Sequence, residues 1–307
     1  MGKILKRRVA LVAGATRGAG RAIAVELARA GAFVYATGRS SKTSGPSEMG
    51  RPETIEETET LVRQVGGDGM AVRVDHLEPD QVEGLIRLIE ARHGHLDILV
   101  NDMFGGDRYA EADKPLWEHD LAGGLRMLRM GVDTHLITLA KVLPLMLRGD
   151  RGLVVEMTDG TAAYNANFRQ QVGFYYDLVK ANVGRIVQGL TAELSQSTVT
   201  AIGVTPGWLR SEMMLENFGV TESNWHDACR KTPGFAISES PTYVGRGIAG
   251  LAADPENCRF AGLILTSRQL ADFYGHTDVD GSRPDCWGLL DAHGMDFEKA
   301  DDIHRFR

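Results

Sequence analysis

The stretch RVALVAGATRGAGRAIAVELARAG, residues 8–31, decides the fold of this chain. It begins with an apolar run typical of a buried strand, turns through the glycine-rich segment GATRGAG (14–20), and continues with the amphipathic pattern of a helix. Glycine lets the backbone turn sharply and approach a ligand closely. Because the free N–H groups and the positive dipole end of the helix would face that ligand, the stretch predicts a phosphate-binding site.

Strand and helix patterns alternate along most of the chain. Amphipathic segments such as 20–31, 79–94 and 132–148 predict helices, and short apolar, β-branched runs lie between them. We therefore expect one α/β domain over residues 1–307, with a doubly wound parallel sheet of about seven strands and helices on both faces. The expected strands are RVALVAG (8–14), FVYATG (33–38), MAVRVD (70–75), DILVN (97–101), GLVVEMT (152–158), TVTAIGV (198–204) and GLILTS (262–267).

Three segments depart from this alternation. SSKTSGPSEMGRPET (40–54) is polar and rich in turn residues, which predicts a surface insertion. Residues 208–240 would either cover a ligand or form a pair of small packing helices, and the tail 275–307 is polar and predicted to be irregular. An apolar, roomy substrate pocket is predicted from the large side chains of the 208–240 segment, which are Trp208, Met213, Met214, Phe218 and Trp225.

Composition excludes several classes of protein. The formal net charge is -7, which argues against a nucleic-acid partner. No apolar run reaches the ~18 residues that a membrane span needs. Cys229, Cys258 and Cys286 have no paired spacing, as is typical of reduced thiols in a cytoplasmic protein, and no metal site is expected.

Four motifs, in this order, resemble the short-chain dehydrogenase/reductase family. The glycine turn has the spacing G-x-x-x-G-x-G, DILVND (97–102) resembles the family's D-x-L-V-N-N stretch, and FYYDLVK (174–180) contains its Y-x-x-x-K pair. TPGWLRSEM (205–213) resembles its P-G-W-V-x-T segment. The resemblance covers most of the chain and thins in the insertion, the 214–240 segment and the tail. It implies a Rossmann-type fold that binds a nicotinamide dinucleotide and an oxidoreductase that interconverts a carbonyl and an alcohol.

The resemblance also implies where the cofactor lies. Asp75 and His76 would lie near the adenine, and Asn101 near the adenosine ribose. Lys180 would hold the nicotinamide ribose. The remaining positions are those of the phosphate-binding turn, Gly14, Thr16, Arg17, Gly18 and Gly20, and those that border the nicotinamide, Pro206, Gly207 and Ser211.

The second expected strand favours NADP(H) over NAD(H). A carboxylate at its end would bind the ribose 2′-hydroxyl of NAD, but the chain has Thr37, Gly38 and Arg39 there. Arg17 also lies in the glycine turn, and two guanidinium groups suit a 2′-phosphate. The alternative for Arg39 is a solvated surface arginine.

Tyr176 and Lys180 are four residues apart, so on a helix they share a face. An ammonium beside a phenol is expected to lower the pKa of the phenol, as suits a general acid/base. By resemblance, Tyr176 exchanges a proton with the substrate oxygen, while hydride transfer is the chemistry of the cofactor. Tyr175 has no lysine four residues on and is predicted to pack.

Two positions depart from the family pattern. Asp159 stands where the family has a serine that orients the substrate oxygen, and Gly131 stands where it has an asparagine that supports a water relay to the lysine. An ionised carboxylate only accepts hydrogen bonds and would raise the pKa of Tyr176. Asp159 could instead bond to the backbone, leaving Thr158 or Thr161 to serve, or it could be neutral in a dry pocket.

The leading interpretation is an NADPH-dependent carbonyl reductase that also runs in reverse. Its substrate would be a small carbonyl or alcohol compound, and the predicted pocket favours a hydrophobic one. The resemblance implies a homodimer or homotetramer built partly from the helix of Tyr176. The alternative is a non-catalytic NADP(H)-binding protein, which the Asp159 and Gly131 departures favour. An S-adenosylmethionine methyltransferase would share the glycine turn but would not explain the Y-x-x-x-K pair or the P-G-W segment.

Overall fold

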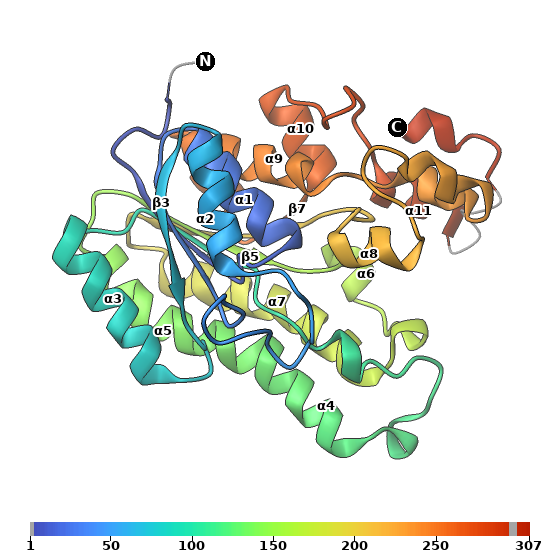
Figure 1. The fold of residues 1–307 in the computed structure, drawn as a ribbon, viewed down its shortest axis with the longest axis horizontal. Helices are drawn as coiled ribbons and strands as arrows, with labels where there is room; N and C mark the ends of the chain where they lie inside the picture. The colour runs from blue at the N-terminus through green and yellow to red at the C-terminus, as the bar shows by residue number, and fades with distance from the viewer. Residues whose placement is uncertain (1–2, 295–299) are drawn as a thin grey trace.

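The computed structural model describes residues 3–294 and 300–307. At its centre is a seven-stranded sheet with the strand order β3-β2-β1-β4-β5-β6-β7, in which every pairing is parallel (Figure 1). All seven strands expected from the sequence are present, with small shifts at their ends. They are β1 (Val9–Ala13), β2 (Phe33–Gly38), β3 (Asp68–Arg73), β4 (Ile98–Asn101), β5 (Gly152–Met157), β6 (Val199–Thr205) and β7 (Ile264–Thr266).

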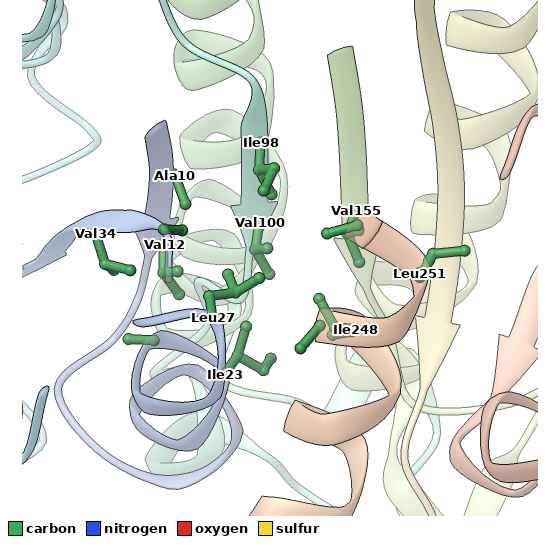
Figure 2. Packing of buried hydrophobic residues seen from close by; sticks show 14 of the residues in the cluster. Ala10, Val12, Ile23, Leu27, Val34, Ile98, Val100, Val155, Ile248 and Leu251 are labelled. Atoms are coloured by element: carbon green, nitrogen blue, oxygen red, sulfur yellow. The ribbon is translucent and has the colours of Figure 1, made fainter. Parts of the chain in front are cut away.

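Helices cover both faces of the sheet, as expected. Side chains alternate along a strand, so Ala10 and Val12 of β1 belong to one buried cluster and Val9 and Leu11 to the other. Figure 2 shows Ala10 and Val12 in the first cluster, near Leu27. The first face carries α1 (Gly18–Arg29), α2 (Ile55–Gln64), α9 (Pro241–Ala253) and α10 (Ser267–Tyr274), and the second carries α3 (Pro79–His93), α5 (Thr134–Met146) and α7 (Phe174–Glu193).

The helix expected over 132–148 begins earlier than its sequence pattern suggests. Asp120 caps α4 (Leu121–Leu128), because its side chain accepts hydrogen bonds from the N–H groups of Ala122 and Gly123. A π-helical turn, Arg129–Asp133, then joins α4 to α5 without a break. Such turns often mark functional sites, and this one contains Gly131.

The 208–240 segment mixes the two structures expected for it. It forms α8 (Glu212–Asn217) and two 3-10 turns, Trp225–Arg230 and Pro233–Ile237. Trp225 and Phe235 are buried and pack with Trp208, Met214 and Phe218, so most of its large side chains stabilise the segment itself. Met213 instead lines a cavity at the carboxyl ends of the central strands.

The tail, expected to be irregular over 275–307, differs from that expectation in its described residues, and residues 295–299 lie outside them. It contains α11 (Cys286–His293) and a 3-10 turn, Ile303–Phe306. The side chain of Asp285 caps α11 at the N–H of Gly288, and Leu289 is fully buried. The sequence pattern of α11 was overlooked because the residues just before it, 275–285, are polar and rich in turn residues.

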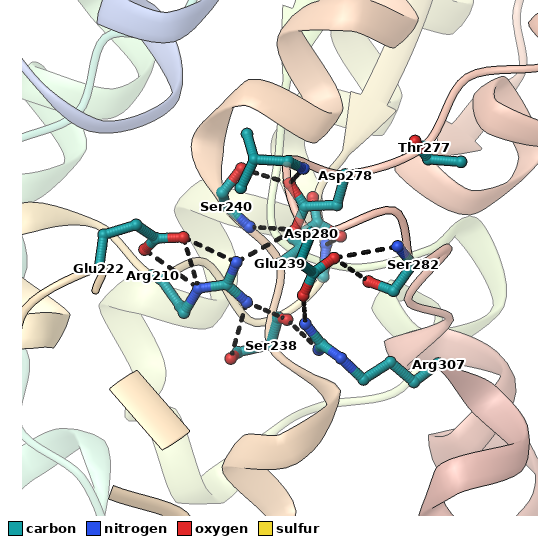
Figure 3. A network of polar contacts seen from close by, with 12 residues as sticks. Arg210, Glu222, Ser238, Glu239, Ser240, Thr277, Asp278, Asp280, Ser282 and Arg307 are labelled. Carbon is teal, nitrogen blue, oxygen red and sulfur yellow. Dashed lines mark hydrogen bonds and ion pairs between the residues drawn. The ribbon is translucent and has the colours of Figure 1, made fainter. Parts of the chain in front are cut away.

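A buried polar network fastens the tail to the 208–240 segment (Figure 3). Arg210 is 1% exposed, and its guanidinium pairs with Glu222 at 2.9 Å and with Asp278 at 3.2 Å. Arg307 pairs with Asp280 and donates to the carbonyl oxygen of Ser238. Since a buried arginine left without its partners is costly, this network holds the two segments together.

No helix among the described residues is both long and apolar enough to cross a membrane.

Candidate active site

A cavity of about 240 Å³ opens at the carboxyl ends of the central strands. It lies beside β1 and β4, where the strand order reverses, which is the place where open α/β sheets bind ligands. The site residues expected from the sequence that line it are Gly14, Thr16, Arg17, Gly18, Arg39, Asp75, His76 and Ser211.

The glycine turn approaches its neighbours too closely for side chains. Gly14 has φ +91°, and a Cβ there would lie 2.4 Å from the carbonyl oxygen of Asp102. A Cβ on Gly20 would lie 2.4 Å from the carbonyl oxygen of Gly14. The turn therefore lines the cavity with backbone at the start of α1, a cradle that would fit the pyrophosphate of a dinucleotide.

A carboxylate lies at this cradle. Oε2 of Glu212, from α8, accepts a hydrogen bond from the N–H of Gly18 at 2.8 Å, and its other oxygen lies 3.4 Å from Arg21. The neighbouring Ser211 caps α8 by accepting from the N–H of Met214. Glu212 therefore occupies the N–H of Gly18, a donor that a phosphate would otherwise use.

Arg39 is not a solvated surface arginine. Its guanidinium lies 3.3 Å from Glu48 of the 40–54 insertion, and Arg126 approaches the same carboxylate at 3.1 Å. Ser47 and Met49 of the insertion line the cavity together with Arg39. The insertion thus forms one wall of the cavity and places the carboxylate of Glu48 beside the guanidinium of Arg39.

The histidine and asparagine of the site differ in their access to the cavity. His76 is bonded at 2.8 Å to the hydroxyls of both Thr37 and Thr138, and burial lowers its pKa to about 3, so the ring is neutral. Asn101 is fully buried, donates to Glu156 at 2.7 Å and does not line the cavity. Asp102 lines it instead, and burial raises the pKa of this carboxyl to about 6.

Glu156 anchors a buried network beneath the cavity. Its other oxygen lies 2.5 Å from Nδ1 of His135, whose Nε2 lies 2.9 Å from the carbonyl oxygen of Met103. Burial opposes the charged form of His135, but Glu156 outweighs it and the pKa of the imidazole is raised. A glutamate within the apolar run GLVVEM was the signal in the sequence for this network.

Tyr176 and Lys180 lie on α7 beside the cavity wall. The Tyr176 ring meets Phe104 edge-on at 5.4 Å, and Phe104 lines the cavity. Nζ of Lys180 lies over the Phe104 ring at 3.9 Å and 5.5 Å from the Tyr176 ring centroid. The hydroxyl of Tyr176 donates to Oδ2 of Asp159 at 3.2 Å.

The pKa of Tyr176 lies well above that of a free phenol, which is opposite to the lowering expected from Lys180. Burial is the largest cause, and the negative charge of Asp159 is the next. Lys180 does not reverse this effect, because its ammonium lies over the Phe104 ring rather than at the phenolic oxygen. Tyr176 is therefore a neutral phenol at neutral pH.

The two threonines near Asp159 are both engaged. The hydroxyl of Thr158 donates to the carbonyl oxygen of Lys180 at 2.8 Å. Thr161 caps α6 (Ala162–Asn165) by accepting from the N–H of Tyr164. Of the three positions considered for the role of the family's serine, Asp159 is the one that contacts Tyr176.

Arg169 is a site residue that the sequence did not reveal. It is 3% exposed, its Nε donates to Asp177 at 2.8 Å, and its Nη1 donates to the carbonyl oxygen of Asp159 at 3.1 Å. Its Nη1 also lies 3.5 Å from the Asp159 carboxylate. Arg169 thus links the loop after β5 to the first turn of α7.

Gly131 and Tyr175 have packing roles. A Cβ on Gly131 would lie 2.3 Å from Cγ1 of Val179 on α7, so the π-helical turn packs too closely for a side chain. Tyr175 is buried in a cluster with Met127 and Val179. The structure therefore agrees with packing for Tyr175.

Pro206 and Gly207 lie outside the cavity lining. The indole N–H of Trp287 donates to the carbonyl oxygen of Pro206 at 2.9 Å, and Oε2 of Glu239 accepts from the N–H of Gly207 at 3.0 Å. Burial raises the pKa of Glu239 to about 8, so this carboxyl is largely protonated at neutral pH. In the described parts of the chain, no three His, Cys, Asp or Glu side chains are grouped to hold a metal ion.

Comparison with known proteins identifies relatives of this chain. The short chain dehydrogenase family model matches residues 8–219. Dehydrogenase/reductase SDR family member 1 from Mus musculus is 29% identical over 282 residues, covering 90% of this chain and 85% of the relative.

Solved structures share the fold. A short-chain dehydrogenase/reductase from Burkholderia xenovorans superimposes with a TM-score of 0.68 at 24% identity, covering 87% of this chain and 96% of that one. Actinorhodin polyketide ketoreductase, solved with NADPH, has a TM-score of 0.68 at 22% identity, covering 87% and 97%.

Proposed function

Because the chain belongs to the short-chain dehydrogenase family, we propose that it is an NADP(H)-dependent oxidoreductase that interconverts a carbonyl and an alcohol. One observation carries the proposal: Tyr176 and Lys180 both contact Phe104, and Phe104 lines a cavity that begins at the glycine turn, although neither Tyr176 nor Lys180 lines that cavity itself. A proton donor and a dinucleotide cradle then serve one site. A methyltransferase would need the cradle but not the tyrosine and lysine.

The chain's own residues would divide the work as follows. The turn Gly14–Gly20 would hold the pyrophosphate, and Asp75 and His76 would border the adenine. Lys180 would bind the nicotinamide ribose, and the nicotinamide, when bound, would supply or accept hydride. Tyr176 would give its proton to the carbonyl oxygen of the substrate.

The state of Tyr176 favours reduction. Burial and the Asp159 carboxylate raise its pKa, so the phenol keeps its proton at neutral pH. A protonated phenol can donate to a carbonyl oxygen, whereas alcohol oxidation needs a phenolate. We therefore assign carbonyl reduction as the preferred direction.

Arg17 and Arg39 support a preference for NADP(H). Both line the cavity, and both could pair with a 2′-phosphate. Glu48 opposes this, because it already pairs with Arg39. The phosphate would displace Glu48, since it carries more charge and more acceptor oxygens than a carboxylate.

The substrate would be a small carbonyl compound with apolar character. Met103, Phe104 and Met213 supply apolar surface to the cavity, and Phe104 contacts Tyr176. Trp225 and Phe218, expected to join them, pack elsewhere. Polar sugars reduced faster than aromatic aldehydes would contradict this assignment.

We also propose a homodimer or homotetramer built partly from α7. Leu178 on this helix is 44% exposed, and Leu136 on α5 is 48% exposed. Burying such side chains against a second copy would stabilise the assembly. Sedimentation velocity would show a single monomeric species if the proposal is wrong.

A non-catalytic NADP(H)-binding protein is the second candidate. Asp159 at the serine position and the raised pKa of Tyr176 favour it. The retained Tyr176–Lys180 pair favours the enzyme. Turnover decides between them.

The test begins with cofactor binding. NADPH and NADH are titrated into the purified protein by cofactor fluorescence, and the titrations are repeated with Arg39→Ala. We expect tight NADPH binding that weakens by roughly tenfold or more in the variant, the loss expected for a charge-assisted contact.

A panel of aldehydes and ketones then tests turnover, with Tyr176→Phe as the inactive control. Binding without turnover would favour the second candidate, and NADH bound as tightly as NADPH would contradict the cofactor assignment.

A further inference from the structure

Asp159 contacts the phenol of Tyr176 and also reaches solvent. Its Oδ2 accepts the hydroxyl hydrogen bond of Tyr176 at 3.2 Å, and its side chain is 42% exposed. We propose that Asp159 is a catalytic proton relay, which carries protons between solvent and the hydroxyl of Tyr176. This inference rests on the proposed function, because a relay has work only if Tyr176 gives up a proton in each turnover.

Arg169 holds the relay in place. Its guanidinium bonds to the backbone oxygen of Asp159 at 3.1 Å and to Asp177 at 2.8 Å, and Asp177 follows Tyr176 on α7. Asp159 is therefore fixed to the same turn of helix as the phenol that it contacts. Arg169 acts through Asp159 and is a positioning residue.

Among the described side chains around the phenol that are considered below, none both contacts the hydroxyl of Tyr176 and reaches solvent as Asp159 does. Thr158 donates to the backbone of α7, and Thr161 caps α6. Lys180 lies over the Phe104 ring, and Gly131 has no side chain to offer. The proton route in this chain therefore runs through the loop after β5.

The proposed step balances as follows. The carbonyl carbon gains hydride, and its oxygen takes the proton of Tyr176, which gives the alcohol and leaves a phenolate. The Asp159 carboxylate takes a proton from water on its exposed side and passes it to the phenolate oxygen. The O–H bond of Tyr176 re-forms, hydroxide leaves to solvent, and Asp159 returns to a carboxylate. Alcohol oxidation follows the same route in reverse.

Three variants of Asp159 test the relay, with 4-nitrobenzaldehyde and NADPH as the probe reaction. Asp159→Asn keeps the shape and an acceptor oxygen, but its amide cannot take up and release a proton near neutral pH. We expect kcat to fall by at least about tenfold while KM for NADPH stays unchanged. Asp159→Glu should keep measurable activity, because it keeps the carboxylate. Asp159→Ala leaves room for a small acid, so added sodium formate should restore part of its kcat and should not raise that of the wild type.

Asp107→Asn tests whether the effect of Asp159 on turnover comes from its negative charge near Tyr176 or from its hydrogen bond to the phenol. Asp107 also raises the pKa of Tyr176 by its charge, but it makes no hydrogen bond to the phenol. If charge alone mattered, the Asp107 and Asp159 variants would behave alike. We expect formate to have no effect on Asp107→Asn.

The outcomes separate this inference from the proposed function. Asp159→Asn that binds NADPH and turns over like the wild type would overturn the relay and leave the proposed function intact. Loss of activity in Asp159→Ala with no response to formate, alongside an inactive Asp159→Glu, would also overturn it, because the residue would then be structural. Wild-type protein that binds no nicotinamide cofactor would overturn the proposed function itself.

Discussion

Glu48 lies where it would compete with a 2′-phosphate for Arg39. It pairs with Arg39 at 3.3 Å and with Arg126 at 3.1 Å, and all three side chains are partly exposed. The charge of this glutamate should therefore limit the affinity for NADPH but hardly affect NADH, which has only a hydroxyl at that position.

We predict that Glu48→Gln tightens NADPH binding by about two- to fivefold, the worth of a partly exposed ion pair. The dissociation constants of NADPH and NADH are measured by fluorescence titration. Glu90→Gln is the matched control, because Glu90 lies on α3, pairs with Arg148 and does not line the cavity. An equal gain for NADH would mean that Glu48 does not face the 2′-position.

Gly131 is a packing position, and we predict that a side chain there destabilises the fold. Gly131→Ala should lower the free energy of unfolding by about 1–3 kcal/mol, since its Cβ would meet Val179 at 2.3 Å. Gly84→Ala, at an open position in α3, should raise it by about 0.5–1 kcal/mol. Urea unfolding measures both. A neutral Gly131→Ala would contradict the close packing of α7 against the π-helical turn.

The contact between α8 and the start of α1 joins two elements far apart in the sequence. Glu212 accepts from the N–H of Gly18 at 2.8 Å, where the resemblance puts the pyrophosphate. A bound dinucleotide would have to displace this carboxylate, so cofactor binding and the position of α8 should be coupled.

We predict that Glu212→Gln tightens NADPH and NADH binding equally, by about two- to fivefold, because the pyrophosphate is common to both. This result would differ from that of Glu48→Gln, which acts on NADPH alone. The same fluorescence titrations measure it. A variant that binds both cofactors more weakly would show that Glu212 helps to hold the nucleotide.

The elements that the sequence predicted are those whose pattern is local. Buried parallel strands are continuous apolar runs, so all seven were recognisable, and the glycine turn lies between a strand and a helix as expected. Helix α11 packs in an apolar cluster with Ile237, and Arg210 of the 208–240 segment pairs with Asp278, so these parts depend on partners that are distant in the sequence.

Site residues were likewise predictable from the sequence where they belong to a local motif. The cavity lining included the glycine turn, Arg39 and His76, which have local motifs. Arg169, Glu48 and Glu212 were missed, because each acts on a residue brought close only by the fold. The lowering of the pKa of Tyr176 expected from Lys180 was wrong, whereas the raising expected from an ionised Asp159 agrees with the structure, in which burial adds to it.

The stability of the protein should fall as the pH rises through neutrality. Burial raises the pKa of Glu239 from its ordinary 4.5 to about 8. Between these values the folded protein holds a proton that the unfolded chain releases, so its contribution is fully present below the lower value and is lost toward the upper one. Burial lowers the pKa of His76 to about 3 and that of His276 to about 4, so these two rings make stability rise with pH up to about 6.5. We therefore predict that urea unfolding shows the decline from about pH 6.5 to about pH 8, and that Glu239→Gln flattens it. An unchanged slope in the variant would assign the decline to other groups.

The most direct test of the enzyme follows the hydride itself. The protein is incubated with 4-nitrobenzaldehyde and NADPH that carries deuterium at both C4 positions, and the alcohol is analysed by mass spectrometry. We predict one deuterium on the carbinol carbon with the wild type and none above background with Tyr176→Phe. Protein that binds NADPH but forms no labelled alcohol from this aldehyde or from a panel of ketones would contradict the assignment as a reductase.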